Sequence, residues 1–174
     1  MAAATSTPEL LEPEGWAVPS TRRTYARGEL VLWSAQHIEG ESLAQVLRSP
    51  ATHKVAIASP KLAPYGAAAQ QALTQLGLWQ AVQPKVVTGE NVGQSFQFVA
   101  TGIARVGFVA RSQVIEAERA KARGEPGLVS ITGTTWPMPG GTASTVDQAL
   151  VQLTRSADNP AARAWLQFLQ TPAA

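Results

Sequence analysis

The sequence predicts an α/β fold in which helices cross over a parallel sheet. Short apolar runs alternate with helical patterns through the middle third of the chain, and several of those helical patterns end at a glycine. Of the 174 residues, 45% are hydrophobic and only 15% are charged, which is enough apolar material for a folded core. Strands that alternate with helices pair in parallel through right-handed crossovers, so a parallel sheet is expected.

The first half of the chain is predicted to fold after a loose lead-in. Residues 1–20 are rich in Pro, Ala, Ser and Thr, with a short helix around 8–11. The elements expected next are a strand over 29–34, a helix over 41–49, a strand over 54–58 and a helix over 65–77. Pro50 stops the first of these helices, and Gly77 ends the second because glycine accepts the left-handed backbone that closes a helix.

The second half continues the alternation before it changes character. The expected elements are strands over 85–87, 105–110 and 146–153, helices over 91–101, 112–122 and 159–169, and a loop over 133–142. The loop is predicted from its glycines and prolines, GTTWPMPGGT. Asn159 is a suitable N-cap for the last helix, and Pro160 suits its first position.

Composition and spacing exclude several classes of function. A net charge of +2 with scattered basic residues argues against a nucleic-acid partner. The absence of cysteine excludes disulfides and thiolate sites, and His37 and His53 lack the local spacing of metal ligands, so no directly bound metal cation is expected. Glu116 and Glu118 point to different faces of a helix, and no serine follows a nucleophile pattern. The chain is therefore predicted not to be an enzyme.

The N-terminus lacks the pattern of a secretory signal peptide. It has neither a basic segment nor an apolar segment of the required kind, so a cytoplasmic location is expected if Met1 is the true start. No apolar run approaches the about 18 residues that a membrane span needs.

Two strand-to-helix junctions share a design that suits an anion. Pro64, Tyr65 and Gly66 follow one strand, and Asn91 and Val92 follow the next. The first N–H groups of a helix lack acceptors and carry the positive end of its dipole, so they can hold an anion without lysine or arginine. Most helix starts hold only water, and plain connecting loops remain the alternative at this point.

Four segments strongly resemble the molybdate-binding periplasmic proteins, the solute-binding components of molybdate ABC transporters. They are TYARGELVLWS (24–34), VAIASPKLAPYGAAAQQALTQLGLW (55–79), VVTGENVGQSFQFVATGIARVGFVARSQV (86–114) and SADNPAARAWLQFLQTPAA (156–174). The resemblance implies a two-lobed, type II periplasmic-binding-protein fold, molybdate or tungstate as ligand without a cofactor, a membrane permease as partner, and a periplasmic location.

The resemblance also implies which residues would bind the oxyanion. Tyr65 matches the tyrosine of the family's APYG motif, and Val92 matches the valine of its GENV motif, a backbone N–H donor. Pro64, Gly66 and Asn91 would support these loops. Ala110 stands where some members have a tyrosine, so that contact is expected to be absent or replaced.

This sequence departs from the family in lacking roughly the first third of its members' length, which carries two serine-bearing loops of the site. The expected organisation is a remnant of lobe one over 1–44, a complete lobe two over 45–125, and a second remnant over 126–174. We expect weak oxyanion binding by this chain alone, and self-association through exposed lobe-one edges, with segments 10–35 and 128–174 exchanged between copies.

Two other functions stay open from the sequence. The same fold serves as the effector-sensing domain of transcription regulators, so a ligand-sensing or interaction module is one alternative. The other is an inactive truncated product that keeps a stable lobe.

Overall fold

The computed structural model describes residues 2–4, 6–124, 133–140, 142 and 144–169. The chain forms two compact units: the first combines Met1–Gly28 with Val146–Ala174, and the second is the continuous segment Glu29–Thr145. Strands β2 (Arg23–Ser34) and β7 (Thr145–Leu150) each have residues in both units. The predicted boundaries at 44/45 and 125/126 stay a prediction.

A mixed sheet forms the centre of the second unit. Its remaining strands are β3 (Val55–Ala58), β4 (Val86–Gly89), β5 (Val106–Ala110) and β6 (Thr134–Pro137). β3 pairs in parallel with β4 on one side and with β5 on the other, which confirms the predicted parallel sheet. The second-unit part of β2 pairs antiparallel with β5 and with β6.

Strand β6 corrects the prediction of a loop over 133–142. Trp136 pairs opposite Leu32, is buried, and donates its indole N–H to the backbone oxygen of Glu41 at 2.7 Å. Pairing with β2 and burial of this large ring outweigh the local turn composition. Pro137 is tolerated because it ends a strand that has a single pairing partner.

The helices of the second unit are α2 (Leu43–Arg48), α3 (Pro64–Gln75), α4 (Trp79–Val82), α5 (Val92–Ala100) and α6 (Arg111–Ala122). Four of them lie where helical spacing predicts them. The short α4 and the 3-10 turn at Gln83–Lys85 are additions. Gly77 and Gly102 have φ of +64° and +77°, the left-handed backbone expected of residues that close a helix.

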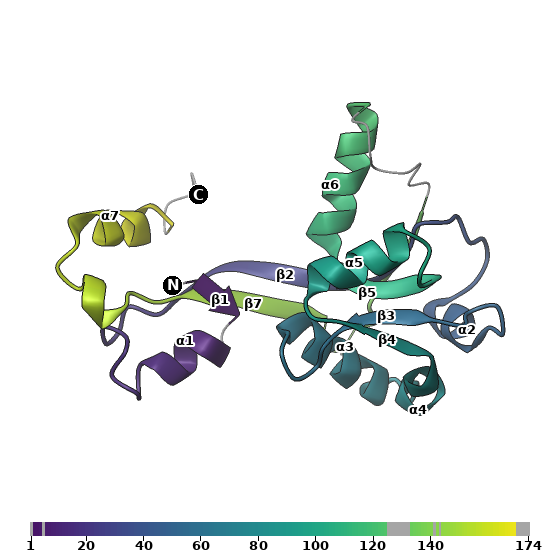
Figure 1. Cartoon of the computed structure of the whole chain (residues 1–174), viewed down its shortest axis with the longest axis horizontal. Coiled ribbons are helices and arrows are strands. Elements are labelled where there is room, and N and C mark those ends of the chain that lie inside the picture. Colours follow the sequence, from purple (N-terminus) through teal and green to yellow (C-terminus); the bar gives the residue numbers. More distant parts are fainter. Residues whose placement is uncertain (1, 5, 125–132, 141, 143, 170–174) are drawn as a thin grey trace. The chain divides into compact units, whose positions relative to one another are not determined.

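The core of the second unit lies on both faces of the sheet. In Figure 1, α5 and α6 lie on one side of strands β3 and β5, and α3 and α4 lie on the other. On the α5 side the rings of Trp33 and Phe96 stack with centroids 4.7 Å apart, among Val31, Ala56 and Val99. Strand residues alternate between the two faces, so each strand contributes to both layers.

The ends of the second unit lie next to each other. The Leu30 N–H in β2 donates to the Ser144 carbonyl oxygen at 2.7 Å, just before β7 begins.

Within the residues that the structure describes, no helix has the length and apolar character to cross a membrane.

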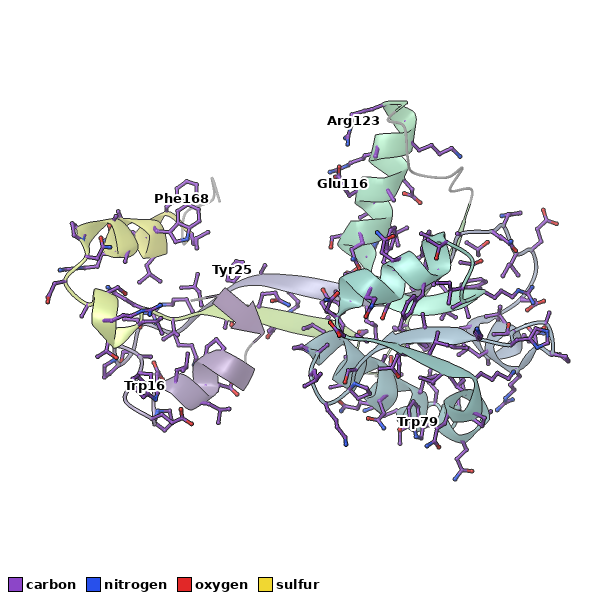
Figure 2. All side chains as sticks on the ribbon, in the orientation of Figure 1. Trp16, Tyr25, Trp79, Glu116, Arg123 and Phe168 are labelled. Carbon is purple, nitrogen blue, oxygen red and sulfur yellow. The ribbon has the colours of Figure 1, made fainter. Side chains whose placement is uncertain are left out.

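The first unit has a smaller apolar interior. It contains β1 (Ala2–Ala4), antiparallel to β7, with α1 (Ser6–Leu11), a 3-10 turn at Thr154–Ser156 and α7 (Pro160–Phe168). The predicted last helix is present, and Asn159 caps it as expected. β7 ends at Leu150, earlier than predicted, and Leu153 instead forms an isolated bridge with Ala17. Figure 2 shows the side chains of this unit, including Trp16 and Phe168, which are both exposed.

Candidate functional site

The start of α3 presents one unbonded backbone donor. Ala63 precedes the helix in an extended conformation and has no capping side chain, and Pro64 has no N–H. The N–H groups of Gly66 and Ala67 both donate to the Ala63 oxygen, at 2.9 and 3.1 Å. In this described turn the N–H of Tyr65 is left without an acceptor. The Tyr65 N–H at this helix start is therefore free to donate a hydrogen bond to a ligand or to water.

Gly66 brings this helix start against the end of β3. A side-chain carbon added at Gly66 would lie 2.2 Å from the Ala58 backbone oxygen, a distance that no real side chain tolerates. Glycine is therefore required at this position for steric reasons, and it fixes the Tyr65 amide at the carboxyl end of the strand.

The start of α5 is built with more polar side chains. Asn91 caps the helix, and its Oδ1 accepts from the Gln94 N–H at 2.9 Å. The Gln94 side chain reaches back, and its Oε1 accepts from the Glu90 N–H at 2.6 Å. No described residue accepts from the amides of Val92 and Gly93. Gln94 was not identified from the sequence, although a glutamine three residues after an N-cap asparagine is a usable signal.

Helices α3 and α5 follow strands β3 and β4, whose last residues lie opposite each other in the sheet. Ala58 at the end of β3 is in register with Gly89 at the end of β4, and the Ser59 N–H donates to the Gly89 oxygen at 2.7 Å. Both junctions thus lie at the carboxyl edge of the sheet, where parallel α/β sheets bind ligands. The positive ends of two helix dipoles also lie there.

The Tyr65 hydroxyl adds a neutral donor. The side chain is half-buried, and this desolvation raises the pKa of the phenol above its ordinary value of 10.0. A raised pKa keeps the proton on the oxygen throughout the neutral range. The group can therefore donate a hydrogen bond to an anion without bringing a negative charge to the site.

Ala110 lies at a third junction, between β5 and α6, and is not an open donor. Its N–H donates to the Gln113 Oε1 at 3.2 Å, and its methyl group cannot donate. The other end of the Gln113 amide lies 3.9 Å from where a side-chain carbon on Gly93 would be, so the start of α6 is close to the start of α5. No sequence motif predicts this role of Gln113.

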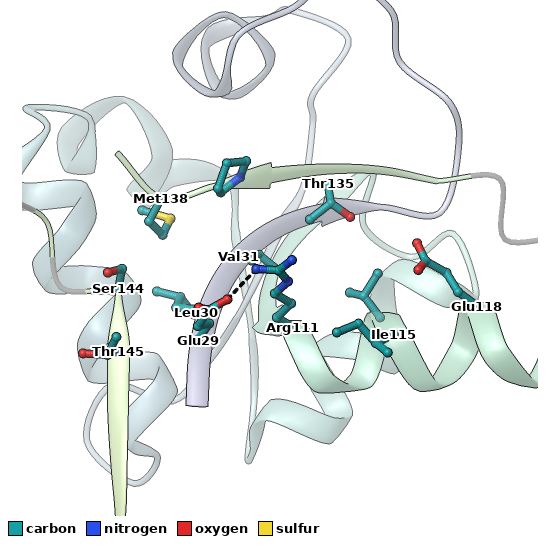
Figure 3. A pocket seen from close by; sticks show the side chains of 12 residues that line it. Glu29, Leu30, Val31, Arg111, Ile115, Glu118, Thr135, Met138, Ser144 and Thr145 are labelled. Carbon is teal, nitrogen blue, oxygen red and sulfur yellow. Dashed lines mark hydrogen bonds and ion pairs between the residues drawn. The ribbon is translucent and has the colours of Figure 1, made fainter. Parts of the chain in front are cut away.

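A cavity of about 500 Å³ lies beside the start of α6 (Figure 3). The Arg111 Nη1 is 2.8 Å from the Glu29 Oε2 at its wall, and both side chains are more than half exposed. Thr135 and Met138 also line this cavity, whereas Tyr65 and Val92 do not. No local sequence pattern predicts this ion pair, because its two residues are 82 positions apart.

The histidines lie at the surface of the second unit. His37 and His53 are exposed, and the His37 Nε2 lies 3.3 Å from the Glu39 Oε1. Across the described ranges, three or more histidine, aspartate or glutamate side chains are nowhere grouped so that they could hold a metal ion.

The chain is similar to two curated molybdate-binding proteins along its whole length. It is 45% identical over 174 residues to the molybdate-binding protein ModA of Azotobacter vinelandii, and 42% identical over 174 residues to that of Rhodobacter capsulatus. It covers 65% and 64% of those proteins, so it spans just under two thirds of their length.

Solved structures share the fold. The periplasmic molybdate-binding protein of Azotobacter vinelandii superposes with a TM-score of 0.82 at 34% identity, over 98% of this chain and 71% of that chain. The sulfate-binding protein SubI of Mycobacterium tuberculosis gives a TM-score of 0.64 at 16% identity, over 95% of this chain and 60% of that one, and so shows the fold alone. The predicted periplasmic-binding-protein fold class is confirmed.

A family described as "Bacterial extracellular solute-binding protein" matches residues 1–174. This match and the two curated relatives confirm the resemblance identified from the four sequence segments. They also agree with the prediction of a binding protein in place of an enzyme. The chain belongs to the bacterial extracellular solute-binding protein family.

Proposed function

We propose that this chain binds a tetrahedral oxyanion of the molybdate or tungstate type for uptake by an ABC transporter. The observation that carries the proposal is the similarity to a molybdate-binding protein, which is 45% identical to this chain over all 174 residues. The permease partner and the periplasmic location are part of the same proposal, and one solved relative is a periplasmic molybdate-binding protein.

The donors in this proposal are the amides of Tyr65 and Val92 together with the Tyr65 hydroxyl. Both amides lack described acceptors and begin helices at one edge of the sheet. Pro64, Gly66 and Asn91 position them, and Ala110 provides no donor, because its N–H is already bonded to Gln113. Neutral donors of this kind suit a dianion that must also be released.

Binding by these 174 residues alone should be weak. The proposed donors all come from one edge of one sheet. A dianion is held tightly only when donors surround it and water is excluded, since charge-assisted hydrogen bonds strengthen in a low dielectric.

Thermal unfolding with four anions tests the proposal. Molybdate and tungstate at millimolar concentration should raise the melting temperature, because a ligand that binds only the folded state stabilises it by mass action. Sulfate and phosphate should have a smaller effect. Equal shifts with all four anions would contradict a selective site, and tight saturable binding in calorimetry would contradict the weak affinity proposed here.

The Tyr65→Phe variant separates the hydroxyl from the amide. It removes the phenol oxygen and keeps the backbone donor, so binding should weaken without being lost. Arg111→Gln, at the separate cavity beside α6, is the matched control and should leave the molybdate response unchanged.

Self-association through the first unit is a further part of the proposal. Trp16, Trp165 and Phe168 expose 65%, 60% and 44% of their surfaces, and α7 has no buried residue. Large exposed rings favour burial against another copy. Light scattering should show a mass above 18.3 kDa that rises with concentration. A monomer at high concentration would refute this part alone.

A further inference from the structure

A second cavity of the second unit lies at the opposite edge of its sheet. It has a volume of about 700 Å³ and is formed where β3 and β5 begin, where β2 ends and where α5 ends. The proposed oxyanion donors lie at the carboxyl ends of β3 and β4, so the two sites are separated by the length of the parallel strands. We call this cavity the basic pocket, defined by His37, His53, Lys54 and Arg105.

The charged and titratable side chains that line the basic pocket are all basic. No aspartate or glutamate is among the residues that line it. Within the described chain, His53 and Lys54 form no hydrogen bond or ion pair through their side chains, and they are exposed. Glu39, whose Oε1 lies 3.3 Å from the His37 Nε2, does not line the pocket, and its side chain is 87% exposed. The electrostatic field inside the pocket therefore favours an anion.

Arg105 supplies the most specific sign of a ligand. Its Nη1 is buried, and no acceptor for it occurs among the described residues. The carbonyl oxygens at the end of α5 accept from other donors, Gln97 O from Thr101, Phe98 O from Ala104 and Val99 O from Gly102, and none of them accepts from the Arg105 Nη1. A buried guanidinium N–H without an acceptor is unfavourable, and a rotation of the Arg105 side chain that turns this group toward a ligand oxygen in the pocket would satisfy it.

We propose that the basic pocket binds a small polyanion that carries phosphate or carboxylate groups. The guanidinium fork of Arg105 matches the two oxygens of either group, and Lys54 adds a point charge. A volume of about 700 Å³ is in the range of small-molecule sites and exceeds the needs of a single tetrahedral ion. The inference is independent of the oxyanion site, which uses neutral donors at the other edge.

Calorimetry with pyrophosphate and citrate tests the proposal on the full chain. At least one of them should bind saturably, and the comparison of the two distinguishes a phosphate ligand from a carboxylate ligand. Lys54→Gln should weaken binding at least threefold, and Arg105→Gln at least tenfold. Arg111→Gln removes an exposed charge at the other cavity and should leave the affinity unchanged.

Three results would overturn the proposal. They are no saturable binding of either probe, an equal loss of affinity in Lys54→Gln and Arg111→Gln, and displacement of the bound probe by molybdate. The second would indicate a general charge effect, and the third would place the probe at the oxyanion edge. If Arg105→Gln does not fold by circular dichroism, the exposed Lys54 decides the test, with Lys54→Arg expected to restore binding.

Discussion

The two units bury their aromatic residues in opposite ways. In the second unit Trp33 is fully buried and stacks on Phe96, and helices cover both faces of the sheet. In the first unit Trp165 stacks on Phe168 at 5.5 Å, yet both rings remain exposed on a helix without a buried residue. The same local interaction, a pair of stacked rings, therefore has a different consequence for stability in each unit.

The difference teaches that the free energy of unfolding is concentrated in the continuous segment 29–145. Stacking contributes little beyond the apolar area that is removed from water. The second unit has large residues that are completely buried from several elements, such as Phe108, Leu47 and Leu73. The buried hydrophobic residues described in the first unit are fewer, and none is aromatic: Ala17, Val146, Ala149, Leu150 and Val151.

Truncation of one tryptophan in each unit gives the largest contrast. Trp33→Ala should lower the free energy of unfolding by about 3–5 kcal/mol, because it leaves a cavity in the core. Trp165→Ala should change it by about 0.5 kcal/mol or less, because the ring is already in water. Chemical denaturation measures both, and Trp33→Phe should recover part of the loss. Equal effects of the two truncations would break the comparison.

Gly66→Ala should have the next largest effect. The added carbon would meet the Ala58 oxygen, so helix α3 or the strand end must move, at a cost of about 1–3 kcal/mol. The movement should also reduce the molybdate response in thermal unfolding. Ala67→Ser, on the exposed side of the same turn, is the control and should retain both stability and response.

Replacing the N-cap of α5 should cost less. Asn91→Ala removes the acceptor for the Gln94 N–H and should destabilise the chain by about 1 kcal/mol. Asn91→Asp keeps the acceptor, so it should preserve stability, but its negative charge beside Val92 should weaken oxyanion binding. If Asn91→Asp lowered stability as well as oxyanion binding, the prediction that the two effects are separate would be wrong.

Acid titration should give the smallest effect, and a similar one in both units. In the second unit the hydrogen bond from Arg123 lowers the pKa of Glu116, and Figure 2 labels Glu116 on α6 and Arg123 at the end of this helix. In the first unit the hydrogen bond from Arg27 lowers the pKa of Asp147. A carboxyl group whose pKa is lowered by folding stabilises the fold at any pH above its ordinary pKa, which is 4.5 for Glu116 and 3.8 for Asp147. This contribution disappears as the pH falls through the lower pKa that the group has in the folded protein.

Carbon NMR of the carboxyl groups measures these two values. Arg123→Gln should raise the pKa of Glu116, and Arg27→Gln should raise that of Asp147, each toward its ordinary value. Because three of the four side chains are at least half exposed and Asp147 is about one-third exposed, the melting temperature should hardly change at neutral pH. An unchanged carboxyl pKa in either variant would show that its ion pair does not persist in solution.

Local signals explain how much of the fold could be predicted. Gly77 and Asn91 act on the backbone beside them, so the ends of α3 and α5 follow from short stretches of sequence. Strand β6 could not be predicted, because Trp136 is in a strand only through its pairing with Leu32, more than a hundred positions away. β1 likewise exists through its pairing with β7.

The oxyanion site and the basic pocket also differ in whether a local sequence motif predicts them. Tyr65 and Val92 were identified because each lies in a short motif at a helix start, and their roles as ligands remain predictions. The basic pocket left no such motif. Lys54 and Arg105 come together because β3 and β5 are parallel neighbours whose first residues lie side by side. Only the sheet order reveals that arrangement.

The hydrogen bond between Leu30 and Ser144 has a practical consequence for protein engineering. It joins residues that lie one position inside each end of the segment Glu29–Thr145, so a very short peptide could connect the two ends. Such a circularised or permuted domain would lose little chain entropy on closure. It would carry both candidate ligand sites as a portable module, free of the exposed rings of its neighbour.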